Sequence, residues 1–91
     1  MELLFKNNII GYINYLYKEN YWIYGTFRAN GKFEKFKEFF EALINEDGFD
    51  ENKFEHELLD EKNWMIKKDG RLIDIDIPAI YDDGEIVFRY R

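Results

Sequence analysis

The spacing of apolar residues first predicts strands, because residues 2–6, 9–17 and 21–29 are rich in β-branched and aromatic side chains. Between the first two of these runs, Asn7-Asn8 tolerates the backbone of a tight two-residue turn. Together the three runs predict an antiparallel meander at the start of the chain.

The spacing then changes to steps of three and one, which is typical of a helix with one apolar face. Between Phe33 and Ile44 six large apolar side chains follow this spacing, and charged residues fill most positions between them. The pattern predicts a helix over about residues 32–45. A second helix is predicted over about residues 51–62, with Asp50 as its N-cap, and its few apolar residues predict a peripheral position.

Strand patterns return in residues 64–68 and 71–81, which are joined by a turn at Asp69-Gly70, and again after the turn at 82–84. The order of elements is therefore βββ-αα-βββ. We expect one α+β domain over residues 1–91, in which two helices cover one face of an antiparallel sheet.

The composition favours a folded domain without the usual catalytic groups. Hydrophobic residues make up 46% of the chain and aromatic residues 20%, which is enough for a core despite 35% charged residues. There is no cysteine or serine, Thr26 is the single threonine, and His56 is the single histidine. Disulfides, thiolate metal sites and hydroxyl or thiol nucleophiles are therefore disfavoured, and we expect neither a cofactor nor an enzyme. No apolar run approaches a signal segment or membrane span, so we expect a cytoplasmic protein without a membrane partner.

The net charge of −6 is concentrated in residues 46–61, where eight acidic residues face the single base Lys53 and give a local charge of −7. This field repels nucleic acid and attracts a basic protein, such as a toxin domain or a nucleic-acid enzyme. The alternative is a solvated surface that only aids solubility. The candidate partner-binding acids are Glu51, Glu55, Glu57, Asp60 and Glu61.

The stretch YWIYGTF, residues 21–27, supplies candidate aromatic contacts. Strand alternation places Trp22 and Tyr24 on the face away from the helices, and Gly25 on the helix side, where a helix aromatic can approach. Trp22, Tyr24 and Trp64 are the candidate anchors of a protein interface. The alternatives are aromatic pairing that only stabilises the sheet, or a self-interface that makes a homodimer.

Asp74 and Asp76 lie on one face of the predicted strand 71–81. Two such carboxylates can contribute to partner binding, hold a divalent metal or a small ligand weakly, or act as an acid–base pair. Acids that alternate on the wet face of a strand explain the same pattern.

Four runs of the chain carry a resemblance: GYINYLY (11–17), YWIYGTF (21–27), FEKFKEFF (33–40) and DGEIVFRY (83–90). With these runs the chain resembles a group of small acidic bacterial proteins of unknown function. In size, acidity and aromatic content it is also similar to immunity proteins of bacterial toxin systems. The second resemblance implies a role in neutralising a basic protein, and neither one implies catalytic residues.

Overall fold

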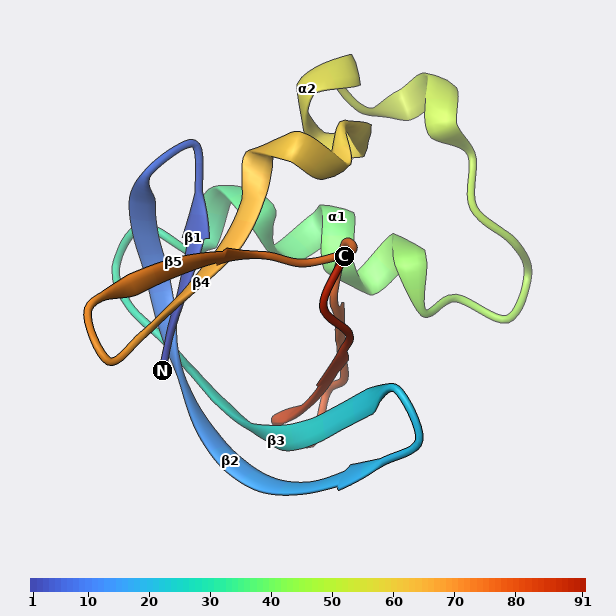
Figure 1. Cartoon of the computed structure of the whole chain (residues 1–91). Helices are drawn as coiled ribbons and strands as arrows, with labels where there is room; N and C mark the ends of the chain where they lie inside the picture. Colours follow the sequence, from blue (N-terminus) through green and yellow to red (C-terminus); the bar gives the residue numbers. More distant parts are fainter.

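The computed structural model describes residues 1–91, which form an α+β domain with one seven-stranded antiparallel sheet (Figure 1). The strand order is β5-β4-β1-β2-β3-β7-β6. The strands are β1 (Glu2–Phe5), β2 (Asn8–Glu19), β3 (Trp22–Ala29), β4 (Trp64–Lys68), β5 (Arg71–Asp74), β6 (Ala79–Ile80) and β7 (Glu85–Phe88). The predicted fold class and the antiparallel sheet are therefore confirmed.

The first hairpin turns one residue earlier than predicted. Lys6 and Asn7, with φ of 48° and 67°, are its central residues, and Asn8 already belongs to β2. Two successive residues with positive φ are typical of the turns that match the twist of a hairpin. The Asn8 side chain donates to the Lys6 carbonyl at 3.2 Å, which supports this turn.

The two predicted helices lie at the predicted places but are shorter. The first consists of the 3₁₀ turn η1 (Glu34–Phe36) and α1 (Lys37–Leu43). The second is divided into η2 (Glu51–Lys53), α2 (His56–Leu59) and η3 (Glu61–Asn63). Asp50 caps the start of η2, as predicted, by accepting a bond from the Asn52 N–H at 3.0 Å. Asp60 lies between α2 and η3 and accepts a bond from the Lys62 N–H at 3.0 Å, which marks a local break in the helix. Such turns compete with a continuous helix.

The predicted strand 71–81 is bent, and its two halves pair with different strands. Its first half, β5, pairs with β4, while its second half, β6, pairs with β7. At the bend, Ile75 forms a bridge to Tyr90, and the Asp76 N–H donates to the Arg89 carbonyl at 3.1 Å. Pro78, which has no N–H to donate, lies buried in the bend.

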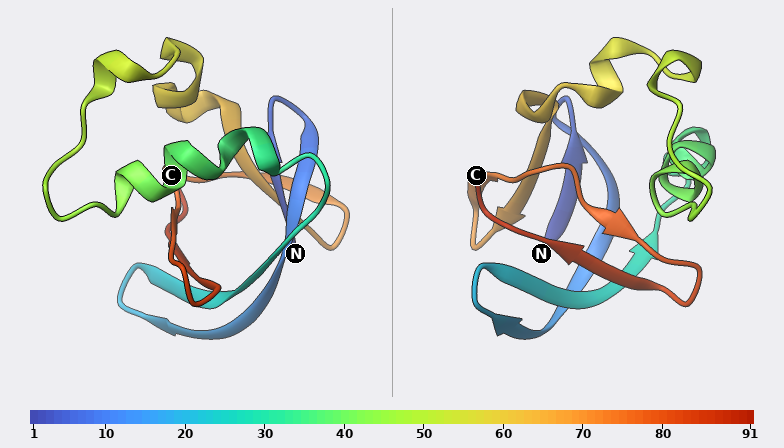
Figure 2. Two further views of the ribbon diagram at one scale, coloured as in Figure 1. Left: turned by 180° about the vertical axis from the view of Figure 1, so that it is seen from behind. Right: turned by 90° about the vertical axis from the view of Figure 1, so that its right-hand side faces the viewer.

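Strands β5 and β6 lie at the two ends of the strand order and belong to the same run of chain. The bend between them therefore closes the sheet into a ring (Figure 1). The predicted packing of two helices on one face of the sheet is not confirmed: the inner face of the ring is the core, and α1 lies across one opening of the ring (Figure 2). No helix combines the length and apolar character that a membrane crossing requires.

Trp64 lies at the centre of an aromatic cluster in the core, with 0% of its surface exposed. Its ring centroid is 4.8 Å from that of Phe5, 5.9 Å from Phe36 and 5.4 Å from Phe40. Phe39 also stacks on Trp64, at 6.1 Å. The aromatic side chains that repeat along the first helical segment, Phe36, Phe39 and Phe40, thus fill the inside of the closed sheet.

Gly25 has a packing role different from the predicted one. The atoms nearest to it belong to β2: a Cβ at this position would lie 2.6 Å from the carbonyl oxygen of Asn14 and 3.2 Å from Ile13 Cγ2. The approach of an aromatic ring to a glycine occurs instead at Gly11, where the ring of Phe27 fills the place of a Cβ. A glycine at position 25 therefore allows the close approach of β2 to β3.

Candidate functional site

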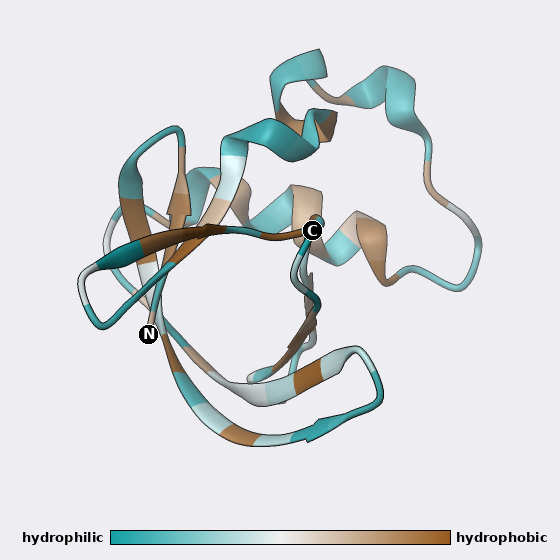
Figure 3. Cartoon of the chain, viewed as in Figure 1, coloured by the Kyte–Doolittle hydropathy of each residue, from teal (hydrophilic) through white to brown (hydrophobic).

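The acidic segment, defined as residues 46–61, lies at one end of the molecule, and most of its residues are hydrophilic (Figure 3). Four partly buried side chains fix its underside to the core: Phe49, Phe54, Leu58 and Leu59. The centroid of Phe54 lies 5.4 Å from that of Phe39, and Trp64 Nε1 donates to the Leu58 carbonyl at 2.9 Å. The acidic side chains are thus carried by a segment that the core holds in place.

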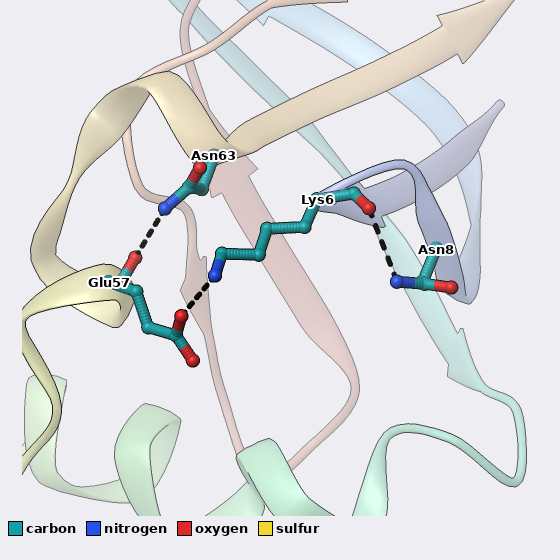
Figure 4. Close-up of polar contacts among 4 residues, drawn as sticks. All are labelled: Lys6, Asn8, Glu57 and Asn63. Carbon is teal, nitrogen blue, oxygen red and sulfur yellow. Dashed lines mark hydrogen bonds and ion pairs between the residues drawn. The ribbon is translucent and has the colours of Figure 1, made fainter.

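One acidic side chain of this segment forms an ion pair. Glu57 pairs with Lys6 of the β1–β2 turn, and the side-chain amide of Asn63 donates to the Glu57 carbonyl at 2.9 Å (Figure 4). The hydrogen bond from Lys6, followed by one that involves Glu55, lowers the pKa of the Glu57 carboxyl. The half-buried Glu57 therefore links the acidic segment to the β1–β2 turn through its ion pair with Lys6.

The other candidate acids of the segment are exposed. Glu51, Glu55 and Glu61 form no ion pair, while Asp60 caps η3 through its bond from the Lys62 N–H. Glu46, Asp47 and Asp50 are also exposed. Seven exposed acids without an ion pair therefore face solvent from one segment.

Replacing Glu57 with glutamine is expected to reduce the acid sensitivity of the domain. Because the folded-state pKa of Glu57 is lowered, its contribution is present above the unfolded pKa of about 4.3 and is lost as the pH falls through the lowered value. Glu57→Gln should therefore be less stable than the wild type at pH 7, and the difference should shrink by pH 3. Urea unfolding at several pH values measures this. Glu38→Gln, which removes an exposed acid without an ion pair, should show no such convergence, and equal behaviour of the two variants would refute the prediction.

Trp22 and Tyr24 lie on the outer face of the closed sheet, as predicted, and Tyr24 is half-buried. Tyr17 stacks on Tyr24 with ring centroids 4.6 Å apart and an interplanar angle of 8°. Tyr15 stands opposite Gly25, and a bulge between Tyr15 and Tyr17 in β2 then places Tyr17, rather than Leu16, opposite Tyr24. The guanidinium of Arg89 lies 5.2 Å from the ring centroid of Trp22.

A groove of about 390 Å³ opens beside these aromatics. We call it the aromatic groove; its lining residues from β3 are Trp22 and Tyr24, and the others are Ile77, Ala79, Tyr81, Glu85 and Val87. Of these lining residues, the sequence did not predict Ile77, Ala79, Tyr81 and Val87 as part of a site. Their alternation was visible in the sequence, but the pairing of β3 with β7 and of β7 with β6, which brings them together, was not.

Trp64 is not available as an interface anchor, which corrects the prediction. It is completely buried, and its only polar atom is bonded to the Leu58 carbonyl. Trp64 therefore belongs to the core beneath the acidic segment and cannot touch a partner while the domain is folded.

Asp74 and Asp76 are each paired with a C-terminal arginine. Arg89 Nε donates to Asp76, and Arg91 Nη2 lies 3.6 Å from Asp74 Oδ1. No group of three His, Asp or Glu side chains is placed to hold a metal ion. In the structure, Asp74 and Asp76 hold the C-terminal residues against the bend that closes the sheet.

The largest hollow, about 540 Å³, lies between the β1–β2 hairpin and η1, and none of the predicted site residues lines it. Its charged lining residues are Lys32, Glu34 and Lys35, all exposed. Its lining contains no histidine, cysteine or hydroxyl side chain and no buried charge, so size alone distinguishes it.

The acidic segment and the aromatic groove are separate surfaces. The acidic segment lies at one end of the molecule, and the β2–β3 hairpin that carries Trp22 and Tyr24 lies at the other in every view (Figures 1 and 2). The candidate residues therefore do not form one combined interface.

Comparisons with protein-family models, curated proteins and solved structures found no match to this chain. The resemblance to small acidic bacterial proteins and to immunity proteins accordingly stays a prediction.

Proposed function

We propose that the chain is a non-enzymatic protein-binding module that binds a basic protein and neutralises or regulates it, as an immunity protein or an inhibitor does. The observation that carries this proposal is the exposure of seven acids without ion pairs on the acidic segment. A cytoplasmic setting and a partner such as a toxin domain or a nucleic-acid enzyme belong to the same proposal.

The electrostatics favour a basic protein over other partners. Acids crowded on one surface raise the local concentration of a cationic partner and speed its association, whereas they repel the phosphates of a nucleic acid. The internal ion pair of Glu57 and the capping role of Asp60 leave Glu51, Glu55 and Glu61 as the side chains best placed to meet a partner. The packing of Phe54 and Leu58 against the core holds these acids in a defined arrangement before binding.

Reversing Glu51, Glu55 and Glu61 to lysine is expected to slow association with the partner about tenfold or more at low salt, and to flatten its dependence on salt. These three side chains form no ion pair and none of the side-chain hydrogen bonds that cap the turns, so the fold should survive. Stopped-flow or surface-based kinetics over a range of salt concentrations measures the rate.

A matched control reverses Glu34, Glu38 and Glu41, which are exposed on η1 and α1 and form no ion pair. Both triple variants have a net charge of zero, since each changes the wild-type value of −6 by +6. If the two variants slow association equally, overall charge and not the acidic segment is responsible, and the proposal fails.

A further inference from the structure

The aromatic groove has a floor of small side chains and walls of large ones. The registers place Tyr24 opposite Val87, and Val87 opposite Ala79, so these three outward side chains form one row across β3, β7 and β6. Trp22 lies two residues before Tyr24 on β3, and Tyr81 two residues after Ala79. The small side chains of Val87 and Ala79 in this row therefore leave a hollow beside the aromatic rings of Trp22, Tyr24 and Tyr81.

The groove contains one acid, and two more acids lie beside it. Glu85 is its one ionisable acid, and Asp82 and Asp83 are exposed in the adjoining β6–β7 turn. The pKa of the Tyr17 phenol, next to Tyr24, is raised, first by desolvation and then by Tyr24, Glu85 and Glu19. The acids thus act on the same aromatic surface that forms the wall of the groove.

The molecule already places one guanidinium on this surface. Arg89 lies over the ring of Trp22 and donates to Asp76, so an aromatic ring and a carboxylate hold it together. A guanidinium stacks on aromatic faces and pairs with carboxylates, and it is more weakly hydrated than an ammonium group. Tyr24, Tyr81 and Glu85 offer the same two kinds of contact, and Glu85 forms no ion pair within the chain.

We propose that the aromatic groove binds an arginine side chain from an extended segment of a partner protein, with the guanidinium between the aromatic rings and against Glu85. This site lies apart from the acidic segment and does not depend on the function proposed for it. A second copy of the chain fits less well, because a symmetric contact would bring Glu85, Asp82 and Asp83 of both copies together. An uncharged apolar segment would leave the Glu85 carboxylate without a partner in a less hydrated setting.

The test uses the ¹⁵N-labelled full chain and NMR titration with the capped peptide Ala-Ala-Arg-Ala-Ala. The control peptide contains citrulline, which keeps the shape of arginine but is uncharged. We expect the arginine peptide to shift the amides of Trp22, Tyr24 and Val87 and the Trp22 indole N–H. The citrulline peptide should bind roughly 3- to 30-fold more weakly, as expected for the loss of a cation contact to aromatic rings.

Two variants connect the shifts to the groove. Trp22→Ala and Glu85→Gln should each weaken binding of the arginine peptide by at least about threefold, whereas Glu38→Gln on α1 should leave it unchanged. The spectra also show whether each variant is folded.

Several results would overturn the proposal, and each has a different meaning. Shifts confined to residues 46–61 would mean that the peptide binds only the acidic segment. Equal binding of the citrulline peptide would mean an apolar groove without preference for a cation. Shifts of Trp22 and Tyr24 with protein concentration alone would mean that a second copy occupies the groove, and no shifts with either peptide would mean that it binds no arginine segment.

Discussion

Replacing Trp64 with alanine is expected to destabilise the domain by about 3–5 kcal/mol, the range found when a large buried aromatic is removed. The side chain is completely buried, and the rings of Phe5, Phe36 and Phe40 surround it. Its removal leaves a cavity among rigid rings and also leaves the Leu58 carbonyl without its indole donor. A domain of this length has a total stability of roughly 5–14 kcal/mol, so the loss is a large fraction of the total.

Urea unfolding followed by far-ultraviolet circular dichroism measures this effect without using tryptophan fluorescence. Trp22→Ala is the matched control, because it removes the same side chain from a surface position that is 43% exposed. The control should lose much less stability. Similar losses at the two positions would mean that Trp64 is not the centre of the core.

Trp64→Phe separates packing from hydrogen bonding. Phenylalanine keeps an aromatic ring in the cluster but cannot donate to Leu58, so hydrogen exchange should accelerate first in residues 54–60, which that bond helps to hold. Acceleration spread evenly over the domain would argue against a specific link between Trp64 and the acidic segment.

Gly25→Ala is expected to cost about 1–3 kcal/mol, as overpacking of a close contact does. The added Cβ would lie 2.6 Å from the Asn14 carbonyl oxygen, and a backbone atom in the neighbouring strand cannot move away without shifting β2. Gly31→Ala is the control, because no atom lies within 4 Å of its Cβ position. It should change stability by no more than about 0.5 kcal/mol. Equal stability of the two variants in urea unfolding would contradict the close approach of β2 to β3.

Local patterns made much of the fold predictable. The strand residues from 2 to 29 alternate or carry β-branched and aromatic side chains, and the steps of three and one around Phe36, Phe39 and Phe40 mark the helical segment that enters the core. These signals depend on neighbours along the chain, and they placed the elements within a few residues.

The closure of the sheet was not predictable from the same signals. Ile73, Ile75 and Ile77 keep their alternation through the bend, so the sequence reads as one straight strand while the backbone changes its partner from β4 to β7. Pro78 indicated an irregularity but not its direction.

The site residues were predicted unevenly for related reasons. Outward alternation correctly placed Trp22 and Tyr24, whereas the burial of Trp64 depends on helix aromatics far away in the sequence. The arginine partners of Asp74 and Asp76 likewise come from the C-terminal residues that follow β7, which a local reading of the acids does not include. Contacts between distant segments, and not local preferences, decided these cases.

The proposed function is tested most directly by capture from a lysate of the source organism with three baits: the wild type, the Glu51/Glu55/Glu61→Lys variant and the Glu34/Glu38/Glu41→Lys variant. Bound proteins are identified by mass spectrometry after washes of rising salt. We expect one basic protein that is retained by the wild type at low salt, released as salt rises, retained by the control variant and lost from the acidic-segment variant. A partner held equally by all three baits, or no partner on any of them, would contradict the proposal that the acidic segment binds a basic protein.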